Sequence, residues 1–339
     1  MGRQSRRLIP AGWRCGLRFG PTLRASPRLA DSLGRVTDQQ QSNDTDERLC
    51  ILTVHAHPDD EASKGAGTIR RYRDDGVHTV LVTCTGGEAG EVINPAMDRP
   101  EVHANLAEVR REELSRAAEI IGYGEVVLLG YHDSGMPDSE ANARPDAFAN
   151  IPPDESTGQL VEVIRRTRPQ VIITYNDDQT GYPHPDHLMV HDISMLAWHR
   201  AGDPAWYPEA GEPFTPSKLY FTVWSTARIK KMHETMLSLG VESPFTQEWF
   251  DRPSQDHRIT SSVPVEGLYQ VRKQALLAHA TQIDPASPFW FGLPDDVAES
   301  VHPYDDYVLY ESRIPTDVPE HDLFAGLRAN AVAGVAAAP

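Results

Sequence analysis

The 339-residue sequence lacks any run of 18 or more apolar residues, which a membrane-spanning helix would require. It has only three cysteines, Cys15, Cys50 and Cys84, and they show neither the C-x-x-C spacing of a thiolate zinc site nor the even number of a disulfide framework. Basic charge is also scarce: 32 basic against 49 acidic residues give a formal net charge of −17. We therefore expect a cytoplasmic protein with a small-molecule ligand and no nucleic-acid or membrane partner.

The first 43 residues have a composition of their own. They contain eight arginines and no lysine, and their acidic residues are Asp31 and Asp38. They also lack the apolar stretch of about 7–15 residues that a secretion signal carries after its basic start. We expect residues 1–48 to form a disordered Arg-rich extension. A single domain over 49–327 and a disordered tail over 328–339 would follow.

From Leu49 onward, short apolar runs alternate with amphipathic stretches. This alternation predicts strands over 49–56, 77–85, 125–131, 169–176 and 218–224, and helices over 62–75, 105–121, 155–167, 186–201, 227–239 and 266–280. Strands that alternate with helices imply parallel βαβ units, hence an α/β fold with helices on both faces of a mostly parallel sheet. We expect the core to span 49–225 and a smaller C-terminal lobe to span 226–327. Much of 285–322 is rich in proline, aromatic and acidic residues, which suggests long loops or a small lobe.

Two chemically dense segments follow predicted strands, at the sheet edge where open parallel sheets bind ligands. The first, H-A-H-P-D-D-E, covers residues 55–61. Its spacing can turn His57 and Asp60 toward one ion while Asp59 points elsewhere. Its acidic residues alone would equally suit the first turn of a helix, where they complement the helix dipole.

The second segment, G-Y-P-H-P-D-H, covers residues 181–187 and holds two histidines in a turn stiffened by two prolines. One histidine and one aspartate from the first segment, with either His184 or His187, would complete the three protein ligands of a catalytic zinc site. Zinc lowers the pKa of its bound water to about 7, and Asp59 is available as the general base. The remaining histidine or Tyr182 could stabilise the oxyanion, and ferrous iron would suit the same ligands.

A-H-P-D-D-E with a downstream H-P-D-H resembles the PIG-L/LmbE-like superfamily of zinc-dependent N-deacetylases and amidases. H-P-D-D-E-x-S-K-G, T-G-G-E-x-G-E-x-x-N-P-A-M-D and H-A-T-Q-I-D are similar to the mycothiol S-conjugate amidase group of that superfamily, and the likeness extends from about residue 49 to 327. The resemblance implies a Rossmann-like fold with a smaller C-terminal portion.

The resemblance also implies roles for individual residues. His57, Asp60 and His187 match the zinc ligands. Asp59 matches the general base, and His184 and Tyr182 match the groups that assist the tetrahedral intermediate. Lys64 stands where the amidases carry lysine and the related deacetylases a small hydroxyl residue. The residues that we expect to contact substrate are Lys64, Glu91, Asn94, Asp133, His279 and Gln282.

The implied reaction is hydrolysis of the amide that joins glucosaminyl-inositol to an S-substituted N-acetylcysteine, in thiol-based detoxification. Two alternatives share its chemistry: a deacetylase acting on N-acetylglucosaminyl-inositol, and an amidase dedicated to natural-product biosynthesis. A dinucleotide-binding protein would need G-x-G-x-x-G after the first strand, where this chain has H-A-H-P-D-D. The intact ligand set argues against a metal-free sugar-binding module, and the sequence leaves homo-oligomerisation open.

Overall fold

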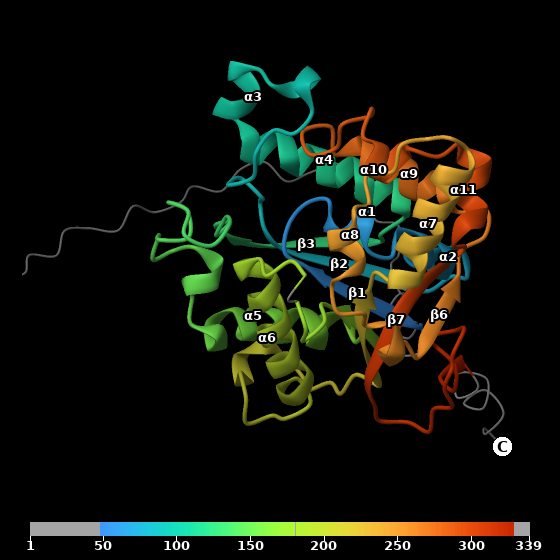
Figure 1. Ribbon diagram of the computed structural model, residues 1–339. Coiled ribbons are helices and arrows are strands. Elements are labelled where there is room, and N and C mark those ends of the chain that lie inside the picture. Colours follow the sequence, from blue (N-terminus) through green and yellow to red (C-terminus); the bar gives the residue numbers. More distant parts are fainter. Residues whose placement is uncertain (1–47, 180, 329–339) are drawn as a thin grey trace, which may run out of the picture. The chain divides into compact units, whose positions relative to one another are not determined.

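The computed structural model describes residues 48–179 and 181–328, so the predictions made for residues 1–47 and for the tail from residue 329 lie outside it. Seven strands of this part form one sheet, in the order β3-β2-β1-β4-β5-β7-β6 (Figure 1). The strands are β1 (Cys50–His55), β2 (His78–Thr85), β3 (Glu125–Tyr131), β4 (Val171–Thr174), β5 (Lys218–Val223), β6 (Ser261–Pro264) and β7 (Tyr304–Ser312).

Helices connect most of these strands, and none of those described is both long and apolar enough to span a membrane. The α-helices are α1 (Asp60–Ser63), α2 (Ala66–Asp74), α3 (Pro100–Ala104), α4 (Leu106–Ile121), α5 (Pro153–Thr167), α6 (Pro185–Arg200), α7 (Thr226–Ser238), α8 (Gln247–Phe250), α9 (Tyr269–Ala278), α10 (Pro288–Phe291) and α11 (Asp295–Val301). Short 3-10 turns occupy η1 (Pro95–Met97), η2 (Phe148–Asn150), η3 (Pro208–Ala210) and η4 (Asp256–Arg258).

Most of the strand pairs are parallel. Strand β1 pairs with β2 and β4, β2 also pairs with β3, and β4 also pairs with β5, all in parallel. Strand β7 differs, because it pairs antiparallel with both β5 and β6. The predicted α/β class is confirmed. The expectation of long loops over 285–322 is wrong in part, since β7 lies within that range.

Alternate residues of β1 divide the core into two layers. Cys50, Leu52 and Val54 pack against α5 and α6, whereas Ile51 packs in a cluster with residues of α2, α4 and α9. Figure 1 shows the same division, with α5 and α6 on one side of the sheet and α4 and α9 on the other. Because both faces of a parallel sheet are covered, every residue of β1 is buried, including the polar Thr53 and His55.

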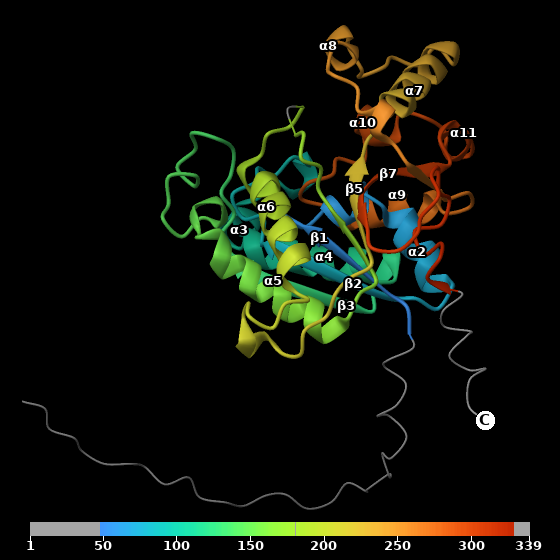
Figure 2. The same cartoon turned by 90° about the horizontal axis from the view of Figure 1, so that it is seen from below.

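The C-terminal part also forms a smaller lobe with its own apolar cluster. Buried Ile229, Met236, Phe245 and Leu293 form the centre of this cluster. Figure 2 shows α7 and α8 projecting on the side of α10, away from α5 and β3. Strands β6 and β7 come from the same part of the chain yet belong to the main sheet, so the domain boundary at residue 226 stays a prediction.

Candidate active site

The predicted site lies where the direction of the strand order reverses. Strands β1, β2 and β3 run outward to one side of the sheet and β4 and β5 to the other, which leaves a crevice between the carboxyl ends of β1 and β4. The loop after β1 leads into α1 and carries His57 to Lys64, and the loop after β4 leads into α6 and carries Gly181 to His187. We refer to residues 57–64, which include α1, as the first site loop. Residues 181–187, which end in the first turn of α6, are the second site loop.

Three side chains of the predicted metal site converge in this crevice. The Asp60 Oδ2 atom lies 3.6 Å from His57 Nδ1 and 3.5 Å from His187 Nε2. The side chains of His57, Asp60 and His187 are 11 %, 5 % and 7 % exposed, so water competes little for them. Two imidazole nitrogens and one carboxylate oxygen suit a divalent ion of zinc type, with a fourth position open.

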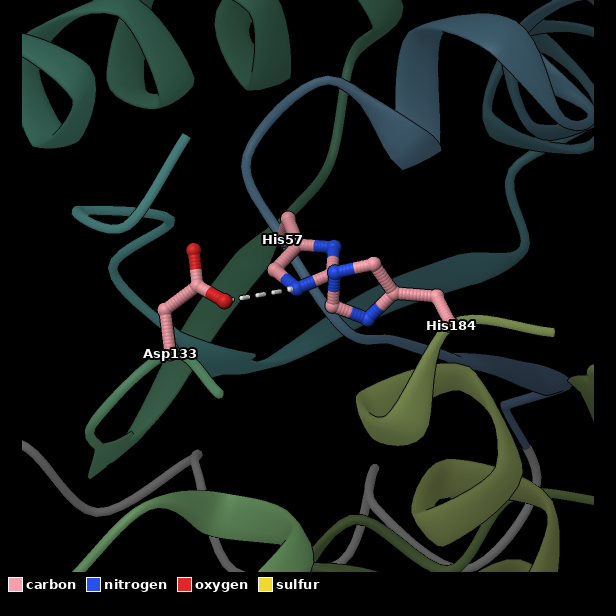
Figure 3. A group of neighbouring side chains, drawn as sticks. All are labelled: His57, Asp133 and His184. Atoms are coloured by element: carbon pink, nitrogen blue, oxygen red, sulfur yellow. Dashed lines mark ion pairs between the residues drawn. The ribbon is translucent and has the colours of Figure 1, made fainter. Parts of the chain in front are cut away.

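A second group of potential ligands shares His57 with the first (Figure 3). The His57 Nε2 atom lies 3.5 Å from Asp133 Oδ1 and 3.1 Å from Asp186 Oδ2, and the ring of His184 packs edge-on at 4.6 Å. A metal-bound histidine usually donates its other N–H to a carboxylate. His57 has this arrangement, because its Nδ1 faces Asp60 and its Nε2 faces Asp133 and Asp186. The geometry therefore favours His57, Asp60 and His187 as the metal ligands.

Charged neighbours set the pKa values of these candidate ligands. Burial raises the pKa of Asp60, but the Lys64 ammonium and His187 outweigh it and hold the pKa well below its usual range. Burial lowers the pKa of His57, but the surrounding carboxylates, Asp133 and Asp186 first, raise it well above its ordinary value. Lys64 forms an ion pair with Asp60 Oδ1, which raises the pKa of the lysine despite its burial.

Asp59 stands apart from the ligands in a strained backbone conformation. Its φ of 108° is rare for a residue with a side chain, and such strain is common at functional sites. Its Oδ2 accepts from Arg110 Nη2 at 3.1 Å, and Arg110 also donates to the carbonyl oxygens of Pro58 and Gly87. Burial raises the pKa of Asp59, with Asp60 adding to the rise and Arg110 opposing it.

The second site loop presents histidines that stay neutral. Burial lowers the pKa of His184 to about 4, with further lowering by His57 and His187. His184 Nδ1 accepts a hydrogen bond from Asp186 N at 3.2 Å and thereby caps α6. Burial also lowers the pKa of His187, whose ring stacks on Tyr175 at 4.4 Å. The ring of Tyr182, 55 % exposed, lies over both histidines at 6.0 and 5.3 Å.

The family profile described as "PIG-L: GlcNAc-PI de-N-acetylase" matches residues 52–198 of this chain. The mycothiol S-conjugate amidase of Streptomyces coelicolor is 43 % identical to it over 295 residues, which cover 84 % of this chain and 99 % of that protein. The chain belongs to the PIG-L family. The predicted enzyme class, a metal-dependent hydrolase of amide bonds, is thereby confirmed.

Other relatives of this PIG-L member carry a different name. The 1D-myo-inositol 2-acetamido-2-deoxy-alpha-D-glucopyranoside deacetylase of Streptomyces scabiei is 37 % identical over 316 residues, covering 89 % of this chain and 94 % of that protein. Among solved structures, the N,N'-diacetylchitobiose deacetylase of Pyrococcus horikoshii superposes with a TM-score of 0.53 at 16 % identity, over 79 % of this chain and 86 % of that one. That likeness supports the fold alone.

Four of the six residues predicted to contact substrate line one pocket of this PIG-L member. The pocket has a volume of about 1160 Å³ and lies over the first and second site loops. The four are Lys64, Glu91, Asp133 and Gln282. Both carboxylate oxygens of Asp133 already accept backbone N–H groups, from Ala89 and Gly135, so this side chain is held firmly at the pocket wall.

The other two, His279 and Asn94, are buried and do not line the pocket. His279 is fully buried, and its Nε2 pairs with Glu61 Oε1 at 2.5 Å behind the first site loop. Asn94 is 6 % exposed and bonds to Ala280 O, and neither residue is among the described residues that line the pocket. In this structure His279 Nε2 and the Asn94 amide are bonded to protein groups beside the pocket. Contact of either side chain with a substrate stays a prediction.

Sequence reasoning missed four residues that support the site. Glu61 accepts from Asp59 N at 3.0 Å, and Asp186 contacts His57, so both support the motifs in which they stand. Their place inside HPDDE and HPDH was a usable signal. Tyr175 directly follows β4, and this position at the carboxyl end of a strand could have identified it as a site residue. Arg110 lies in a helix with several other charged residues, and nothing in its local sequence distinguishes it.

Proposed function

We propose that this chain is a zinc-dependent amidase that hydrolyses mycothiol S-conjugates to glucosaminyl-inositol and an N-acetylcysteine S-conjugate, in thiol-based detoxification. The observation that carries the proposal is the convergence of His57, Asp60 and His187 at the β1–β4 crevice. The 43 % identity to the Streptomyces coelicolor amidase, over nearly all of that protein, supports the substrate. Ferrous iron is the alternative metal.

Asp59 is the proposed general base. A zinc ion held by the three ligands would supply a Lewis acid for the amide carbonyl and a water nucleophile near neutral pH. The Asp59 carboxylate lies outside the ligand set, and its raised pKa brings it closer to the pH at which it must accept a proton. Arg110 holds that carboxylate in one orientation through the 3.1 Å contact with Oδ2.

His184 and Tyr182 are the proposed donors to the tetrahedral intermediate. Since His184 Nδ1 accepts from a backbone N–H, the neutral ring carries its proton on Nε2. A neutral imidazole with a fixed Nε2–H can donate to a developing oxyanion without losing a charge. The Tyr182 hydroxyl is a second donor from the same loop. Lys64, Glu91, Asp133 and Gln282 are the proposed contacts for the polar half of the substrate.

A second candidate is deacetylation of N-acetylglucosaminyl-inositol. The Streptomyces scabiei deacetylase, at 37 % identity over 94 % of its length, favours this reading. The two reactions break an amide on the same amino sugar and differ in the acyl group. The lysine at position 64 favours the amidase, because the related deacetylases carry a small hydroxyl residue there.

The deciding experiment offers both substrates to the purified full-length chain. Metal content is measured in the same preparation, and release of the free amine is followed for a mycothiol S-conjugate and for N-acetylglucosaminyl-inositol. We expect about one metal ion per chain and a kcat/KM at least about 10-fold higher for the conjugate. A higher kcat/KM for the acetyl compound would replace the amidase proposal with the deacetylase.

A further inference from the structure

The large pocket has two halves of different chemistry, on opposite sides of the proposed metal site. Its polar half follows β2 and β3 and carries the carboxylates Glu91 and Asp133, with the apolar Ile93 and Met136 also in its lining. Its apolar half follows β5 and continues into α7, α8 and α10. Because β1 and β4 stand between these strands in the sheet, the metal ligands separate the two halves. A substrate whose amide bond is hydrolysed at the proposed metal site would place one product in each half of the pocket.

Four aromatic side chains build the apolar half, and we call them the aromatic wall: Trp224, Trp249, Phe289 and Trp290. Phe289 is the centre of this group. Its ring stacks parallel to Trp224 at 5.8 Å, meets Trp249 at 5.7 Å and packs edge-on to Trp290 at 4.8 Å. All four are half-buried and line the pocket, so part of each ring is open to a ligand there. Arginine side chains lie over the rings of Trp224, Trp249 and Trp290.

The wall begins beside the reacting centre. The Trp224 indole Nε1 donates to the carbonyl oxygen of Ser63 at 3.3 Å, at the end of α1. The next residue, Lys64, pairs with the metal-ligand candidate Asp60. A group attached within a few bonds of the scissile carbonyl would therefore reach the wall directly.

Size and charge indicate what this half would accept. A volume of about 1160 Å³ exceeds the upper limit of about 1,000 Å³ for typical ligand pockets, and an acetyl group would leave most of the apolar half unfilled. At the far side of the wall, the Arg252 guanidinium lies over the Trp249 ring at 4.1 Å. Flat π systems stack on such rings, and electron-rich ones also gain from the nearby cation.

We propose that the aromatic wall binds the S-substituent of the acyl half and selects flat aromatic substituents over small aliphatic ones. The proposal rests on the amidase function and specifies its substrate class. Trp249 is the proposed specificity residue. The ring contacts run from Trp224, beside the first site loop, through Phe289 to Trp249, so Trp249 is the member that can be changed without disturbing the metal ligands. It has no contact with the first site loop among the interactions found in the described residues.

Binding of the acid half tests this without turnover. N-acetyl-S-benzylcysteine and N-acetyl-S-methylcysteine differ only in the substituent, and their affinities for the full-length chain are measured by calorimetry. We expect the benzyl compound to bind at least about 10-fold more tightly. Trp249→Ala should lose most of that preference and Trp249→Phe should keep much of it. Trp206→Ala, which changes an exposed tryptophan outside the pocket, should keep all of it.

Equal affinity for the two compounds in the unmodified chain, or a full preference in folded Trp249→Ala, overturns the proposal. Should Trp249→Ala not fold, quenching of the unmodified chain's tryptophan fluorescence by the benzyl compound but not the methyl one supports it, and equal quenching contradicts it. Failure of the amidase function is a separate result. In that case no mycothiol conjugate is hydrolysed, whichever way the two acids bind.

Discussion

The two site loops meet at one crevice but carry opposite kinds of groups. In the first, each of three successive carboxylates has a cationic or imidazole partner: Asp59 has Arg110, Asp60 has Lys64, and Glu61 has His279. In the second, His184 and His187 have lowered pKa values, and their neighbours are largely rings. The partners in the first loop lower the pKa values of Asp60 and Glu61, while burial raises that of Asp59. Burial in the second loop lowers the pKa values of both histidines.

This division suits cation binding. A metal ion needs deprotonated carboxylates and neutral imidazoles together, and protons compete for both. Lys64 lowers the pKa of Asp60 before any ion is bound, and burial does the same for His187. Charge pairing therefore prepares Asp60, and desolvation prepares His187. The third proposed ligand, His57, differs, because the surrounding carboxylates raise its pKa and a metal ion would have to displace its proton. Substitutions in each loop can test whether the division is real.

The largest effect is expected in the second loop. His187→Ala should lower the bound metal to a small fraction of the wild-type content, because a two-ligand site remains. Amide hydrolysis should fall by about 10⁴-fold or more, since the Lewis acid is lost with the metal. Metal analysis of the purified variant and amine release at saturating substrate measure both effects.

The control for this variant is His199→Ala, an exposed histidine near the end of the same helix. It should keep full metal content and full activity. Full occupancy in His187→Ala would remove His187 from the ligand set and leave the group of His57, Asp133 and His184 as the alternative.

A substitution in the first loop should lower turnover without lowering the metal content. Asp59→Asn keeps the shape and tolerates a positive φ, so metal content and melting temperature should change little. Turnover should fall by about 10²–10⁴-fold, the usual range for loss of a general base. Asp138→Asn is the matched control, because Asp138 is another aspartate with positive φ but is exposed and outside the pocket. A loss of metal in Asp59→Asn would make Asp59 a ligand.

The contrast between the loops also explains what the sequence could predict. The first loop is contiguous, so His57, Asp59 and Asp60 are recognisable from their spacing alone. The partners of its carboxylates are remote: Arg110 lies 51 residues from Asp59, and His279 lies 218 residues from Glu61. Only the folded chain brings them together, which is why His279 was predicted to contact substrate when it is buried behind the loop.

Strand β7 escaped prediction for a related reason. Its sequence places Asp305 and Asp306 inside a strand, where carboxylates are rare, and this obscures the apolar pattern. Their partners compensate in the fold: Asp305 accepts from Thr68, and Asp306 accepts from Ser225 and pairs with His302. The aromatic wall was missed because its members come from separate segments of a region with weak periodicity.

The smallest expected effect is on stability and concerns His55, the last residue of β1. It tests whether burial alone also keeps an imidazole neutral outside the second site loop. This imidazole is fully buried, and neither ring nitrogen has a hydrogen-bond partner among the described residues. Burial lowers its pKa to about 4, from an ordinary value of 6.5. Between these two pH values the unfolded chain takes up a proton at His55 that the folded chain excludes. The free energy of unfolding should therefore fall as the pH is lowered from 6.5 to 4, and this residue should account for about 3 kcal/mol of the loss.

His55→Leu should abolish that component, because leucine has a similar volume and no proton to bind. Urea denaturation of the metal-depleted chain at several pH values between 6.5 and 4 gives the free energy of unfolding for both proteins. Their difference should change by about 3 kcal/mol across this range, while His199→Leu, an exposed position, should follow the wild type. A constant difference between His55→Leu and the wild type would mean that His55 is charged in the fold. In that case burial without hydrogen-bond partners would not keep the His55 imidazole neutral. The comparison between the two site loops would then not extend to β1.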